Sequence, residues 1–213
     1  MPSERERFMA VMRDQPFDRI PWVARMEIWY NARLNTGTLP GEFEGCHLYD
    51  IHKRIGMGIL GRFPLFEERL DDTVSVTTER DDRNLITTYR TPLGSVSTRD
   101  ELAPRLKEMG VESPLRREFM IREDAHYDVV RYILKHTAYV PHYEGYLDYD
   151  GEIGEQGVTM AFVNRSPLQR LLLEIMGYEK TYYEIQDNPG KLAQLFELLL
   201  EKGRELIRIA VQS

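Results

Sequence analysis

The sequence predicts an α/β protein that forms the first part of a larger barrel, with an antiparallel β-meander inserted into it. Three apolar runs, residues 20–26, 58–63 and 158–163, have the length and continuity of buried parallel strands. Each is followed by segments with helical spacing. A barrel of alternating strands and helices usually needs about 250 residues. We therefore expect the 213-residue chain, which ends inside a long amphipathic segment, to be the N-terminal part of one such domain.

Several segments before residue 66 have the sequence pattern of short helices. Ser3 and Glu6 have the spacing of a capping box, which predicts a helix from there to about Arg13. Residues 28–35 indicate a short helix or ordered loop after the first strand. Residues 47–55 carry apolar side chains at helical spacing, so we expect a second helix that ends near Gly56.

Residues 66–100 differ in pattern from the rest of the chain. Apolar and polar residues alternate with period two from Arg69 to Thr98. Turn-forming residues at 81–84 and 91–94 divide this stretch into three runs. The pattern predicts a three-stranded antiparallel meander with one solvated face, inserted into the barrel domain that spans residues 1–213.

The second half of the chain is largely helical in pattern. Apolar stripes predict helices beginning near Glu123 and at 142–153, before the third strand. After that strand we expect further helices, at about 167–176, at 178–186 and from Pro189 to the C-terminus.

Composition excludes several classes of function. The net charge of −7 and the isoelectric point near 5.4 argue against nucleic acid or an anionic membrane as partner. No apolar run reaches membrane-spanning length, and the charged N-terminus lacks a secretory apolar core. We therefore predict a cytoplasmic protein. Cys46 is the single cysteine, so neither an intrachain disulfide nor a cysteine-based zinc cage can form.

The histidines show no metal-ligand spacing. His47 and His52 are five residues apart on a predicted helix, which places them poorly for a shared ion. The other three are His126, His136 and His142. We interpret all five as surface or core residues, and we predict no metal bound by this segment.

The end of the first predicted strand carries Arg25, Glu27, Trp29 and Tyr30. Ligands in α/β proteins bind at the carboxyl ends of strands, which makes these residues candidates for substrate binding. Arg25 would contact an anionic group, or it forms a structural ion pair with Glu27. Trp29 and Tyr30 would wall the pocket, or they pack at its rim.

The second and third predicted strands also end in polar residues, Arg62 and Asn164-Arg165-Ser166. Ser166 before Pro167 has the pattern of a helix N-cap with proline at the first position. The same geometry presents free N–H groups to an anion, so both interpretations stay open. The charged run at 116–118 is interpreted as a solvated face.

Two stretches resemble the uroporphyrinogen decarboxylase superfamily, namely SERERFMAVMRDQPFDRIPWV at the N-terminus and VTMAFVNRSPLQRLLLEIMGYEKTYYEIQDNPGKLAQLFELL near the C-terminus. That superfamily contains the decarboxylase of haem synthesis and methyltransferases that act on corrinoid and thiol carriers. The resemblance implies a TIM-type (β/α)8 barrel, with the meander similar to an insertion in the methyltransferase-like branch.

The chain departs from the haem-synthetic decarboxylases at three places. Their arginine-glutamine-alanine-glycine-arginine-tyrosine signature aligns with residues 25–30, where the second arginine is replaced by Trp29. An indole cannot replace a guanidinium that binds carboxylate. Arg62 lies where the decarboxylation aspartate is expected, and Leu173 lies at the position of the helix tyrosine.

The resemblance therefore favours a methyltransferase-type enzyme, with a small anionic substrate and a corrinoid protein as partners. It implies zinc and a corrinoid as cofactors of a longer protein, whose zinc ligands would lie in the C-terminal half. Two alternatives are kept: a decarboxylase of a polycarboxylate such as uroporphyrinogen, which would use Arg25 and Arg62 as a clamp, and a non-catalytic half-barrel assembly module. The last would act as a homo-oligomer or with a complementing C-terminal half.

Overall fold

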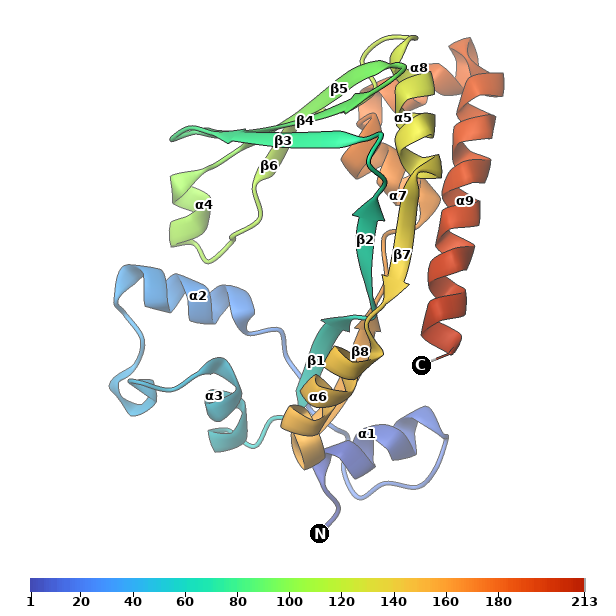
Figure 1. The fold of residues 1–213 in the computed structure, drawn as a ribbon. Helices are drawn as coiled ribbons and strands as arrows, with labels where there is room; N and C mark the ends of the chain where they lie inside the picture. The colour runs from blue at the N-terminus through green and yellow to red at the C-terminus, as the bar shows by residue number, and fades with distance from the viewer. Residues whose placement is uncertain (213) are drawn as a thin grey trace. The chain divides into compact units, whose positions relative to one another are not determined.

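A computed structural model describes residues 1–212 as a mixed α/β fold divided into two compact units (Figure 1). The first unit comprises residues 1–65, 104–113 and 142–162, and the second comprises 66–103, 114–141 and the stretch from Val163. The predicted α/β class is confirmed. No sheet within residues 1–212 closes into a barrel, so the barrel stays a prediction.

The first unit contains a parallel strand pair. β1 (Ile59–Pro64) pairs with β8 (Gly157–Phe162) in continuous register, from Ile59 opposite Gly157 to Pro64 opposite Phe162. The second and third predicted strands are thus confirmed to within one residue. A side chain at position 157 would lie 1.8 Å from the carbonyl oxygen of Ile59, which explains why β8 begins at a glycine.

The first unit also contains helices, which precede β1 or lie between β1 and β8 along the chain. They are α1 (Glu4–Met12), α2 (Glu27–Thr36), α3 (Leu48–Arg54), α4 (Pro104–Glu108) and α6 (Tyr143–Ile153), with short 3-10 turns η1 (Gly41–Phe43) and η2 (Gly154–Gln156). The Ser3–Glu6 capping box starts α1 as predicted. Arg5 on α1 donates to both carboxylate oxygens of Asp150 on α6, at 3.0 and 2.7 Å, which holds the two helices together.

The prediction of a buried first strand at 20–26 is wrong. This stretch has no regular secondary structure. A backbone hydrogen bond links it to the residue just before β1, from the N–H of Gly58 to the carbonyl of Trp22, at 2.9 Å. Ile20 is 80% exposed and Trp22 is 53% exposed. An apolar run needs a hydrogen-bonding neighbour on its edge to become a strand, and none of the described strands pairs with it.

The second unit contains the predicted meander. β3 (Ser75–Arg80), β4 (Asn84–Thr91) and β5 (Gly94–Glu101) pair antiparallel in sequence order. A fourth strand, β6 (Leu115–Glu118), pairs with β5, which the sequence did not predict. A separate antiparallel pair joins β2 (Phe66–Leu70) to β7 (Thr137–Pro141).

The core of the second unit lies between the sheet and its helices. These are α5 (His126–Lys135), α7 (Pro167–Arg170), the π-helical turn η3 (Leu171–Ile175), α8 (Tyr178–Asp187) and α9 (Pro189–Val211). Val96 of the sheet, Val130 of α5, Ile175 of η3 and Leu195 of α9 belong to one buried cluster. Across residues 1–212, none of the helices combines the length and the apolar character that crossing a membrane requires.

Candidate anion-binding site in the second unit

A pocket of about 510 Å³ opens inside the second unit, lined by the sheet, by α5 and by the segment from Asn164 to Ile175. Three arginines line it: Arg116 from β6, Arg165 from the loop after β8, and Arg170 from α7. Uncompensated like charges would repel one another, and each of the three guanidinium groups is paired with a carboxylate, that of Asp100 or that of Glu174.

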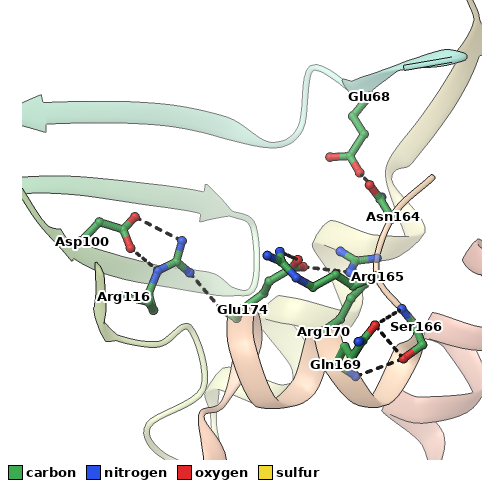
Figure 2. Close-up of polar contacts among 9 residues, drawn as sticks. All are labelled: Glu68, Asp100, Arg116, Asn164, Arg165, Ser166, Gln169, Arg170 and Glu174. Carbon is green, nitrogen blue, oxygen red and sulfur yellow. Dashed lines mark hydrogen bonds and ion pairs between the residues drawn. The ribbon is translucent and has the colours of Figure 1, made fainter. Parts of the chain in front are cut away.

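Arg116 is held in place by Asp100, its neighbour across the strand pair (Figure 2). The guanidinium donates from Nε and Nη2 to the two carboxylate oxygens, in the fork geometry that arginine and carboxylate favour. Its third nitrogen, Nη1, donates to the main-chain oxygen of Glu174 at 3.0 Å. Asp100 is 7% exposed, so Arg116 provides the counter-charge for a buried carboxylate.

Arg165 and Arg170 share a single carboxylate, that of Glu174. Arg165 Nη1 donates to Oε1 at 2.8 Å, and Arg170 Nε donates to Oε2 at 3.1 Å (Figure 2). The Arg165 side chain is 55% exposed, whereas that of Arg170 is 15% exposed. The Glu174 carboxylate is thus bound by one solvent-exposed arginine, Arg165, and by one largely buried arginine, Arg170.

The loop that carries Arg165 is fixed on both sides. Asn164 Nδ2 donates to Glu68 Oε1 on β2 at 2.8 Å. Ser166 caps α7: its backbone N–H donates to Gln169 Oε1 at 3.2 Å, and its hydroxyl accepts from the Gln169 N–H. The predicted N-cap is confirmed. The N–H groups of Ser166 and Gln169 are therefore occupied, whereas Nε and Nη2 of Arg165 donate to none of the described residues.

Two tyrosines lie near arginines of the pocket, Tyr89 near Arg116 and Tyr139 near Arg170. Burial raises the pKa of Tyr89, which lines the pocket, while the nearby Arg116 guanidinium acts in the opposite direction. Burial also raises the pKa of Tyr139 on β7, against the opposing charge of Arg170. Both phenols therefore remain protonated at neutral pH and can donate hydrogen bonds.

The predicted site residues fall in both units. Asn164 and Arg165 line the pocket, and Ser166 lies next to them. The remaining five, Arg25, Glu27, Trp29, Tyr30 and Arg62, belong to the first unit.

The first-unit candidates make the following contacts. Arg25 Nε lies 3.8 Å from Glu27 Oε2, in an exposed ion pair. Trp29 packs edge-on against Phe43, and the Tyr30 hydroxyl donates to the Cys46 carbonyl at 2.9 Å. Arg62 is exposed on β1. Their role in substrate binding stays a prediction.

Sequence reasoning missed Arg116, Arg170 and Glu174. The interpretation of residues 116–118 as a solvated face is wrong for Arg116, whose side chain is 28% exposed and points into the pocket. The period-two rule could have found it, because Arg117, the neighbour on the opposite face, is 48% exposed. Arg170 and Glu174 are four apart, a spacing that indicates a helical ion pair.

Among residues 1–212 no group of three or more histidine, cysteine or acidic side chains is arranged to hold a metal ion. The zinc that the resemblance implies would have its ligands in a longer protein, so it stays a prediction, and we derive no chemical step through it.

The fold and this pocket define a mixed α/β protein with an arginine-lined cavity. Comparisons of the chain with protein-family models, curated proteins and solved structures find no match.

Proposed function

We propose that this chain is part of an enzyme that acts on a small anionic substrate, and that the pocket of the second unit binds the substrate's anionic group. The observation that carries the proposal is the convergence of Arg116, Arg165 and Arg170 on one pocket. Guanidinium groups bind carboxylate and phosphate through paired hydrogen bonds. Partial burial strengthens such bonds, because the surrounding dielectric is low.

The reaction we propose is methyl transfer of the uroporphyrinogen-decarboxylase-like methyltransferase type, to or from a corrinoid or thiol carrier. The resemblance of the two terminal stretches supports it, and the replacements at Trp29, Arg62 and Leu173 favour it over haem-pathway decarboxylation. The test is to incubate the protein with methylcobalamin and a thiol and to follow the methylated thiol by mass spectrometry. Enzyme-dependent product supports the proposal, and its absence with and without added zinc counts against it.

Decarboxylation of a polycarboxylate is a second candidate, because the guanidinium groups at the pocket are of the kind that binds carboxylate. Release of carbon dioxide from a panel that includes uroporphyrinogen and smaller polycarboxylates would distinguish it from methyl transfer.

A half-barrel assembly module is the third candidate, in which the chain acts as a homo-oligomer or with a complementing partner. Sedimentation velocity tests it, because such a module should self-associate or bind its complement. A monomer that unfolds in one cooperative step contradicts it.

A further inference from the structure

Glu174 lines the pocket, and its carboxylate contacts both Arg165 and Arg170. Its two carboxylate oxygens each accept one hydrogen bond, from Arg165 Nη1 and Arg170 Nε. Arg165 Nε and Nη2 donate to none of the described residues. Glu174 therefore holds the arginines in a paired state and leaves donors of Arg165 available to an incoming group.

The charges show why this carboxylate matters more than the others. Asp100 neutralises Arg116 through two hydrogen bonds and is buried, so that pair is fixed. Glu68 also lines the pocket, where it accepts from the neutral amide of Asn164. Arg165 and Arg170 share the single Glu174 carboxylate, so the donors that it occupies become available to a ligand only when the Glu174 side chain leaves them.

The backbone of Glu174 is anchored while its side chain keeps access to solvent. Glu174 lies in the π-helical turn η3, where the Met176 N–H donates to the Leu171 carbonyl at 2.9 Å. Single π-helical turns occur frequently at functional sites. The Glu174 carbonyl accepts from Arg116 at 3.0 Å, whereas its side chain is 32% exposed. Rotation about the side-chain bonds alone can therefore free the arginines.

The pocket wall also includes apolar side chains. Leu70, Met120, Ile133 and Ile175 line it together with the ring of Tyr89, and so do the polar residues Glu68, Thr98, Thr137 and Asn164. A pocket lined by both charged and apolar side chains can accept a ligand with one carboxylate and an apolar body.

We propose that Glu174 is an internal competitor for the arginine pair, and that the ligand is an amphipathic carboxylate whose carboxylate displaces it. This inference rests on the proposed function, since it requires that the pocket bind an anion. The exchange is one carboxylate for another, so the number of ion pairs in the pocket is unchanged.

The experiment is calorimetric titration of the protein with octanoate and with benzoate, using 1-octanol and benzyl alcohol as uncharged controls. Glu174→Gln keeps the side-chain shape but removes the charge that competes. We expect about tenfold tighter carboxylate binding by this variant than by the unchanged chain, and no change for the alcohols. Glu174→Asp keeps the charge but cannot reach both arginines, and it too should bind more tightly.

The matched control is Glu101→Gln, which removes an equal charge from the exposed pair with Arg117 in the same sheet. It should leave affinity unchanged. Weaker carboxylate binding by both Glu174 variants would overturn the inference, because it would show that Glu174 positions the arginines for the ligand. Carboxylate binding that survives Arg165→Gln combined with Arg170→Gln, or no binding by any variant, would instead refute the anion pocket itself.

Discussion

Arg116 on β6 donates a hydrogen bond from Nη1 to the main-chain oxygen of Glu174 in η3, across 58 residues of sequence. The same guanidinium pairs with the buried Asp100 on β5. One residue therefore joins the sheet to the segment that carries Arg165 and Arg170. Because Arg116 binds both β5 and η3, replacing Arg116 should change the stability of the second unit and the geometry of the pocket together.

Arg116→Met should destabilise the second unit. It leaves Asp100 buried without its counter-charge, and we expect a loss of about 2 kcal/mol in the free energy of unfolding, below the range for a fully buried pair because Arg116 keeps some exposure. Urea denaturation measures it. Arg117→Met is the matched control: its pair with Glu101 is exposed, so the loss should stay below about 1 kcal/mol. Equal losses in the two variants would show that Asp100 does not depend on Arg116.

Leu195→Ala on α9 should cost about 3 kcal/mol, because Leu195 is fully buried in the core cluster and its truncation leaves a cavity. Ile207→Ala lies on the same helix but at a position that is 59% exposed, and its effect should be within about 0.5 kcal/mol. Thermal and urea unfolding of the two variants compares them directly. A small effect of Leu195→Ala would mean that α9 does not pack on this core.

Tyr127→Phe should weaken a buried polar network. The Tyr127 hydroxyl donates to Glu184 Oε2 at 2.8 Å, and Lys180 and Asn188 donate to the same carboxylate. Loss of one hydrogen bond to a buried charge is expected to cost about 1.5 kcal/mol. Tyr132→Phe, which removes a solvent-exposed bond to Thr73, serves as the control and should cost less. A larger loss in the control would contradict this assignment.

Stability should fall as the pH is lowered through the range in which His52 titrates. His52 is 4% exposed, and neither ring nitrogen has a hydrogen-bond partner among the described residues. Burial lowers its pKa below the usual 6.5, while the Glu27 carboxylate acts in the opposite direction. His52 therefore binds a proton more readily in the unfolded chain than in the folded chain. The stability that neutral, buried His52 gives the fold is fully present above pH 6.5 and is lost as the pH falls below it.

The measurement is urea denaturation between pH 7.5 and pH 5. His52→Leu should flatten the dependence on pH and should not destabilise the protein at pH 7.5. His47→Asn replaces the histidine at the exposed start of the same helix and keeps an N-capping residue, so it should retain the dependence. A His52→Leu profile as steep as that of the unchanged chain would assign the effect to other groups.

Local patterns were sufficient for much of the fold. Period-two alternation predicted β3, β4 and β5, because each strand pairs with its neighbour in sequence through a short turn. Helical spacing and capping residues predicted α1, α3, α5 and α6. The apolar run at 20–26 shows where this reasoning stops, since a strand also needs a partner that lies elsewhere in the chain.

The sequence by itself determined the α/β class, the meander and the polar loop that contains Asn164 and Arg165. These depend on side-chain periodicity and on residues close together in the chain. Only the tertiary structure decided that Arg116, Arg170 and Glu174 share a pocket with that loop. Their contacts join segments up to 58 residues apart, and the identity of such partners is set by packing.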